Sequence, residues 1–170
     1  MANTWMNSDA LFLKTGTEEA RLSVAGEYRN SGPDHVTEVT IFDMTTLTTG
    51  SAIIDDATFI PKGARINEVT LITDTVVTGS SSTLNVGLTK FDRTTAIDAD
   101  GLLAAIPLTS MDAAGETTTY RVGVSGVGAL VGTTTAFAGY LCADWDTAVF
   151  TAGKVRIRVS YSFPVTNAFV

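Results

Sequence analysis

The chain has 170 residues, a length that fits one domain, and 45% of them are hydrophobic, which is enough for a normal core. Its net charge of −7 argues against binding to a nucleic-acid backbone or an anionic membrane, because both need clustered Lys and Arg. No apolar run approaches the roughly 18 residues of a membrane-spanning helix. The first ten residues lack the pattern of a signal peptide, so we expect a protein made in a cytoplasm.

Threonine is unusually clustered along the chain. It is β-branched and favours strands, and its hydroxyl suits a face that meets solvent or another subunit. With 15 glycines and few helix-favouring residues, this composition predicts an all-β protein. The clusters are Thr45-Thr46, Thr48-Thr49, Thr117-Thr118-Thr119 and Thr133-Thr134-Thr135.

The N-terminal stretch is polar except for a few large apolar side chains, among them Trp5 and Met6. We predict an N-terminal arm over residues 1–10 and a single β-sandwich domain over residues 11–170. Trp5 either closes the domain's own core or docks on a neighbouring subunit, as aromatic anchors do. Both interpretations are open at this level.

Short apolar runs predict the first strands of the sandwich. Strands are expected at Leu11–Leu13, at Arg21–Tyr28 and at Val36–Phe42. Thr17–Ala20, between the first two, is expected to form either one helical turn or a loop.

The stretch from Ile60 to Phe91 predicts a central hairpin of the sandwich. Ile60–Gly63 has the composition of a type I turn, and strand-type residues follow from Ile66 to Val77. Gly79–Ser82 interrupts the run, and the alternation from Leu84 to Leu88 is typical of a half-buried strand.

Residues 92–105 are the best candidate for a helix, with Asp98 or Asp100 as its cap and Pro107 at its end. Asp98-Ala99-Asp100-Gly101 also resembles part of a calcium loop. The downstream ligands of that loop are absent in register, so the helix entry is the favoured interpretation.

A strand is predicted at Thr117–Val124, in which Tyr120, Val122 and Val124 would share one face, and four glycines lie at its end and after it: Gly123, Gly126, Gly128 and Gly132. A phosphate-binding glycine motif would lead into a helix, but here the next residues, 133–137, are strand-like. We therefore expect a flexible apolar loop or a glycine-tolerant strand.

The C-terminal part predicts two more strands. One covers residues 136–145, and the other has the cleanest alternation in the chain, with apolar residues from Val155 to Phe163 separated by Arg and Ser. Together these elements predict a jelly-roll-like, two-sheet antiparallel β-sandwich of about eight strands with one short helix.

Catalytic constellations are not evident in the sequence. Cys142 and His35 are the single residues of their types, and they lie in unrelated contexts without a family signature. The carboxylate pairs Asp98/Asp100 and Asp144/Asp146 would each share one strand face, but acidic loops and edges are common in such a protein. We expect no enzymatic activity, no metal and no cofactor.

Three segments of the sequence together resemble a known class of protein. They are the opening Met1-Ala2-Asn3 with Trp5, Asn7 and Asp9, the turn-and-strand segment 59–66, and Thr83–Leu88 followed by Asp98–Leu102. This arrangement resembles small virion structural proteins of tailed bacteriophages, some of which are capsid decoration, or cement, proteins. The resemblance covers the first two-thirds of the chain and brings no catalytic residues.

The resemblance implies a β-rich homo-oligomer, with a trimer favoured, that binds the major capsid protein on the outside of the expanded shell and stabilises it. The protein would then be made in the host cytoplasm and found on the capsid surface of the virion. The candidate capsid or subunit contacts are Trp5, Met6, Val127, Leu130, Val131, Thr133 and Thr134.

The alternative is a receptor- or carbohydrate-binding sandwich module of a tail fibre or head appendage. Such modules place exposed aromatic rings beside Asp and Asn. Trp145 between Asp144 and Asp146 is the candidate site for that function.

Overall fold

The computed structural model describes residues 4–6, 12–14, 34–41, 43–48, 52–53 and 58–163. The chain divides into two compact units, Met1–Asp34 and His35–Val170. In the first unit, β1 (Thr4–Met6) pairs antiparallel with β2 (Phe12–Lys14). This confirms a strand within one residue of the predicted Leu11–Leu13. The predicted strand at Arg21–Tyr28 and the turn at Thr17–Ala20 lie outside the described residues, so the division at residue 10 stays a prediction.

Two β-sheets form the second unit. One has the order β3 (Asp34–Ile41), β11 (Phe150–Ser162), β6 (Arg65–Gly79) and β9 (Thr117–Tyr120). The other has the order β4 (Ala52–Ile53), β10 (Gly139–Asp146), β7 (Thr83–Thr89) and β8 (Ala96–Pro107), and β5 (Phe59–Ile60) also pairs with β10. Short 3₁₀ turns occur at η1 (Met44–Thr46) and η2 (Leu108–Ser110).

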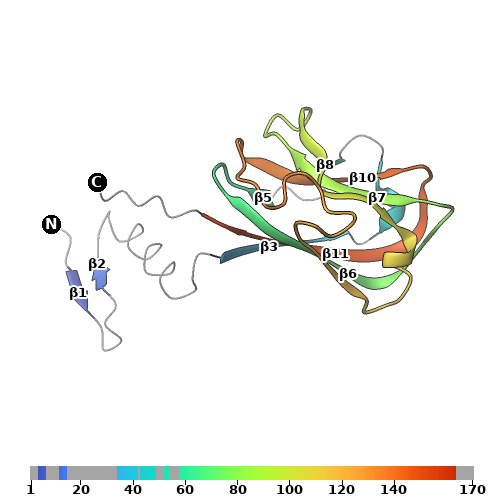
Figure 1. Cartoon of the computed structure of the whole chain (residues 1–170), viewed down its shortest axis with the longest axis horizontal. Helices are drawn as coiled ribbons and strands as arrows, with labels where there is room; N and C mark the ends of the chain where they lie inside the picture. The colour runs from blue at the N-terminus through green and yellow to red at the C-terminus, as the bar shows by residue number, and fades with distance from the viewer. Residues whose placement is uncertain are drawn as a thin grey trace. The chain divides into compact units, whose positions relative to one another are not determined.

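The strand pairs are nested along the chain. β3 pairs with β11, β4 and β5 pair with β10, β6 pairs with β9, and β7 pairs with β8. This is the connectivity of one long hairpin that has been rolled up into two facing sheets, which defines a jelly roll. Figure 1 shows the two layers, with β7, β8 and β10 in one and β3, β6 and β11 in the other. The predicted all-β, jelly-roll-like sandwich is confirmed.

The core lies between the sheets and follows the predicted alternation of β11. Val155, Ile157 and Val159 are fully buried, whereas Arg156 and Arg158 point to the outer face. There, Arg156 Nε lies 2.9 Å from an Asp74 carboxylate oxygen, and Arg158 pairs with a glutamate from β3. One strand therefore supplies both the apolar seam and a charged outer surface.

The predicted hairpin from Ile60 to Phe91 is wrong, because β6 and β7 belong to different sheets. The connection between them crosses the sandwich at Gly79–Ser82. Ser82 is buried there and its hydroxyl donates to the Val149 carbonyl oxygen at 2.9 Å. A Cβ on Gly79 would overlap the Ser82 hydroxyl, so a larger residue here would displace that side chain from its hydrogen bond. A short polar loop between two apolar runs fits a hairpin and a sheet-to-sheet crossing equally well. The sequence pattern therefore could not distinguish the two connections.

The turn before β6 also differs from its prediction. The hydrogen bond runs from the Ala64 amide to the Pro61 carbonyl, at 3.3 Å, so the turn is one residue later than expected. Gly63 occupies its third position with φ of +85°, which a type II turn requires and a type I turn does not.

The predicted helix at 92–105 is wrong as well, because most of this segment is β8. Asp92 instead caps a turn by accepting hydrogen bonds from the Thr94 and Thr95 amides. β8 carries a large irregularity: between the pairs Leu88–Asp98 and Val86–Leu103 it advances five residues while β7 advances two. This bulge removes the alternation by which a strand is recognised.

No helix among the described residues is both long enough and apolar enough to span a membrane.

Candidate functional site

The glycine-rich segment 121–138, here called the glycine loop, is hydrogen-bonded to the open edge of β8. The Gly126 carbonyl accepts from the Ala104 amide at 2.8 Å, and the Gly128 amide donates to the Leu102 carbonyl at 3.0 Å. The Leu130 amide donates to Gly101 at 2.8 Å. The loop thus satisfies backbone groups at this sheet edge that would otherwise stay unpaired.

The same loop then reaches the other sheet. The Gly132 amide donates to the Ile66 carbonyl at 2.7 Å, and the Ile66 amide donates to Thr133 at 3.1 Å. The Thr135 amide donates to the Ala64 carbonyl at 2.8 Å. The loop is therefore neither a free loop nor a regular strand. Its backbone hydrogen bonds connect β8 of one sheet to the beginning of β6 in the other.

The predicted contact residues of this loop divide into two groups. Val131 is only 6% exposed and belongs to the core, and Val127 and Leu130 are half buried against it. Val131 therefore cannot present its side chain to a partner while the sandwich is folded. Thr133 and Thr134 are exposed, as predicted for contact residues. The contact role itself stays a prediction.

The large apolar side chains that the loop does expose are different ones. Val122 is 71% exposed and Phe137 is 53% exposed, with Val124 also at the surface. The predicted strand Thr117–Val124 is wrong at its end, because β9 stops at Tyr120 and the chain turns outward. Trp5 lies in β1 opposite Leu13, and Met6 follows it in that strand.

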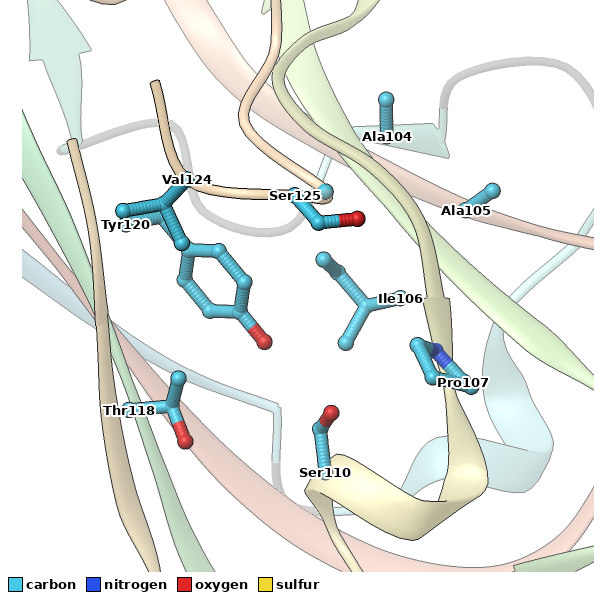
Figure 2. A pocket seen from close by; sticks show the side chains of 10 residues that line it. Ala104, Ala105, Ile106, Pro107, Ser110, Thr118, Tyr120, Val124 and Ser125 are labelled. Atoms are coloured by element: carbon cyan, nitrogen blue, oxygen red, sulfur yellow. The ribbon is translucent and has the colours of Figure 1, made fainter. Parts of the chain in front are cut away.

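A pocket of about 390 Å³ lies beside the glycine loop, between the edge strands β8 and β9 (Figure 2). Ile106 and Val124 contribute apolar surface, and the hydroxyls of Tyr120, Ser110 and Ser125 line the cavity with them. The remaining lining residues are Ala104, Ala105, Pro107, Thr118 and Gly126. This volume is large enough for one sizeable side chain or a small ligand.

The pocket supplies hydrogen-bonding hydroxyls. Burial raises the pKa of the Tyr120 phenol, a hydrogen bond with Ser110 opposes that rise, and the nearby Glu116 charge adds to it. The phenol is therefore neutral at physiological pH and acts as an ordinary donor and acceptor. The hydroxyls of Tyr120, Ser110 and Ser125 can therefore form hydrogen bonds with a polar group in the pocket.

Asp98 and Asp100 lie two residues apart on β8. Burial raises the pKa of Asp98 above its ordinary value, and the hydrogen bond and charge of Asp100 raise it further. A calcium site would need more oxygen ligands than these two. Within the described part of the chain, no group of three or more His, Cys, Asp or Glu side chains comes together, so the partial calcium-loop pattern is not completed.

Replacing Asp98 with asparagine is expected to stabilise the protein at neutral pH. A carboxylate whose pKa is higher in the folded chain than in the unfolded chain destabilises the fold when it is ionised, and this loss disappears as the pH falls below both pKa values. We expect Asp98→Asn to raise the melting temperature by about 2 °C at pH 7 and to match the wild type near pH 3. The exposed Asp112→Asn is the control, and an equal rise in both variants would contradict this account.

The Asp144-Trp145-Asp146 segment lies on β10 and does not assemble as the sugar-binding alternative requires. Trp145 points toward the core, and its indole Nε1 donates to the Leu47 carbonyl at 3.0 Å. Strand alternation places Asp144 and Asp146 on the opposite face. The ring and the carboxylates therefore cannot surround one ligand.

Cys142 and His35 lie on strands of different sheets. Cys142 is fully buried in β10, whereas His35 lies in β3 of the other sheet, stacked on Tyr161 with 5.4 Å between ring centroids. The structure thus forms no Cys–His pair of the kind that nucleophilic catalysis uses.

An exposed cluster of rings and cations, not expected from the sequence, lies where β7 ends and β10 begins. Phe91 meets Tyr140 edge to face, at 5.0 Å between centroids, and Phe137 lies 5.1 Å from the Lys90 ammonium. The Arg93 guanidinium lies 5.6 Å from the centre of the Tyr140 ring. The signal in the sequence was the Lys-Phe-Asp-Arg run after a strand, but Phe137 joins it only through the fold.

Comparisons with known proteins find a similar fold among solved structures. No protein-family model matches the chain, and no curated protein matches it either. A chain in the solved capsid asymmetric unit of cyanophage Pam1 shares the fold with a TM-score of 0.53 and 21% identity, over 77% of this chain and 85% of that chain. The resemblance to phage virion proteins is thus confirmed at the level of the fold.

Two further solved capsids contain chains that align with this one. The acidic stable capsid of Helicobacter pylori bacteriophage KHP30 gives a TM-score of 0.42 and 18% identity, over 77% of this chain and 88% of that chain. The capsid of Ralstonia phage GP4 gives a TM-score of 0.43 and 18% identity, over 78% of this chain and 86% of that chain.

Proposed function

We propose that this chain is a bacteriophage virion structural protein that decorates the outside of the major capsid shell and stabilises it. The observation that carries the proposal is the shared jelly roll, which covers 85% of a chain in the Pam1 capsid asymmetric unit. The acidic net charge of −7 supports a position away from packaged DNA. The proposal assigns the chain a binding role and no catalytic one.

The mechanism follows from mass action. A protein that binds only the assembled, expanded shell lowers the free energy of that state by an amount that grows with its concentration and affinity. Contacts that span several capsid subunits must then break before the shell can open. We further propose that the chain acts as a homo-oligomer, with a trimer favoured, because closed symmetric oligomers match the symmetric junctions of a shell.

Two regions are proposed to contribute contacts. One is the N-terminal segment with Trp5 and Met6, and the other is the exposed part of the glycine loop, including Thr133 and Thr134. The ordered attachment of that loop to both sheets supports its use as a contact surface, because a preformed loop loses little conformational entropy on binding.

Co-sedimentation with shells of the phage that encodes this chain tests the proposal. Purified protein is expected to pellet with expanded shells that lack it, and to pellet weakly or not at all with unexpanded shells. If the purified protein binds neither form of the shell, the decoration role is contradicted.

A further inference from the structure

We infer that the cluster of Phe91, Phe137, Tyr140, Lys62, Lys90 and Arg93, here called the aromatic–cationic patch, is the docking surface for an acidic segment of the capsid protein that carries one large apolar side chain. The inference rests on the proposed function and adds to it the face and the chemistry of the contact. The patch lies in the second unit, and its side chains come from the turn after Ile60, the turn after β7 and the entry to β10.

The apolar part of the patch is large and preformed. Phe91 and Phe137 are each 53% exposed, and they are the aromatic members among the exposed large hydrophobic side chains in the described part of the chain. The edge-to-face contact with Tyr140 holds the Phe91 ring in place. Removing such fixed rings from water favours binding without much loss of side-chain entropy.

A groove of about 390 Å³ runs between the rings. Phe91 and Phe137 line it together with Lys62, Lys90 and the small Ala138. The groove is large enough for one apolar side chain. Asp92 is the acidic member of the lining, and hydrogen bonds from Thr94 and Thr95 lower its pKa to about 2, so it stays ionised beside the three cations of the patch.

The positive charges of the sandwich are unevenly distributed. Four of them form ion pairs with Glu or Asp at the outer face of the four-stranded sheet: Arg121, Lys154, Arg156 and Arg158. Lys90 and Arg93 lie against rings of the patch. Within the part of the chain that the structure describes, Lys62 and Lys90 have no ion-pair partner.

Charge complementarity identifies the occupant as acidic. A chain with a net charge of −7 that concentrates cations around exposed rings is suited to an anionic partner at this face. Nucleic acid also combines negative charge with stacking rings, but its backbone requires a longer cationic track, and the acidity of the whole chain repels it. An acidic protein segment with one apolar anchor satisfies both the groove and the charges.

The test measures the affinity of variants for expanded shells that lack the chain. Phe91→Ser/Phe137→Ser removes the rings, and Lys90→Glu reverses one charge. Val149→Ser and Arg158→Glu are the matched controls, because Val149 is an exposed apolar residue outside both proposed contact regions and Arg158 pairs with Glu38 on the outer face of the other sheet. Both patch variants are expected to bind at least about tenfold more weakly than the wild type and to keep its cooperative melting, whereas the controls bind normally.

Salt gives an independent measurement on the wild type. Raising NaCl from about 0.05 M to about 0.5 M is expected to weaken binding to the shells, and the Lys90→Glu variant is expected to show a shallower dependence.

The failures can be told apart. If the wild type binds expanded shells and the patch variants bind equally well, the patch is not the contact while the decoration role stands. If the wild type binds no shell, the decoration role and this docking surface both fail. The inference is also overturned if the wild type binds a fluorescent single-stranded oligonucleotide and the patch variants lose that binding, since the occupant would then be nucleic acid. It is likewise overturned if the patch variants alone dissociate into smaller species in sedimentation velocity, since the occupant would then be a second copy of the chain.

Discussion

Ile157→Asp is expected to abolish folding. Ile157 is fully buried at the centre of β11, opposite Leu71 of β6, in the strand pair that forms the middle of the four-stranded sheet. A carboxylate there would have neither water nor a cation on the core side. The loss of several kcal/mol is comparable to the whole stability of a domain, about 5–15 kcal/mol. Purified from inclusion bodies and refolded, the variant should show no cooperative thermal transition in circular dichroism.

The matched control is Val122→Asp. Val122 is also an apolar β-branched residue, but it is 71% exposed, so the new charge stays in water and the melting temperature should change little. A soluble Ile157→Asp protein that melts cooperatively would show that the facing of β11 is not as described.

The second large effect is expected from Gly128→Ala. A Cβ at this position would overlap the carbonyl carbon of Gly101 and the carbonyl oxygen of Asp100. Both are backbone atoms of β8, so no side-chain rotation can relieve the overlap. We expect the free energy of unfolding in urea to fall by about 3 kcal/mol, because the loop must move off β8 and its hydrogen bonds are lost.

Hydrogen exchange locates that effect. The amides of Gly128 and Leu130, which donate to β8, should lose their protection in Gly128→Ala. Ala129→Val adds more volume to the next residue, which is exposed, and should leave the stability and the protection unchanged. Wild-type stability in Gly128→Ala would contradict the close approach of the loop and β8.

The parts of the fold that follow from local alternation were predictable. In β11 every second residue from Val155 to Val159 is buried, since one face packs on the other sheet and the other face meets water. Strand pairing was not predictable in the same way. The Gly79–Ser82 connection joins two apolar runs whichever sheet the second one enters, and the choice depends on distant strands, β9 and β8, that pair with them.

β8 shows a second limit of local patterns. Leu102 and Leu103 are adjacent and both fully buried, which in a regular strand with one solvated face is not expected. The cause is non-local: the bulge and the glycine loop cover this strand, with Val127 bridged to Leu103. Leu102 and Leu103, which follow the possible helix caps Asp98 and Asp100, therefore resembled the apolar residues of a short helix.

The exposed side chains of the candidate contact regions were predictable only in part. The glycine loop was recognised as unusual, but the apolar side chains chosen from it, Val127, Leu130 and Val131, pack against or within the core. The aromatic–cationic patch depends on Phe137 coming beside Lys90, 47 positions away in the sequence, a contact that only the tertiary fold creates. Exposure, which decides whether a side chain can contact a partner, is a property of that fold.

We propose that this jelly roll binds the outside of the expanded capsid shell. The most direct measurement is a binding isotherm by co-sedimentation, with expanded and unexpanded shells of the encoding phage tested in parallel and the bound protein quantified at saturation. Binding to expanded shells is expected to saturate at a fixed ratio to the major capsid protein, and binding to unexpanded shells is expected to be much weaker. Equal binding to both forms, or binding to neither, would contradict the proposal.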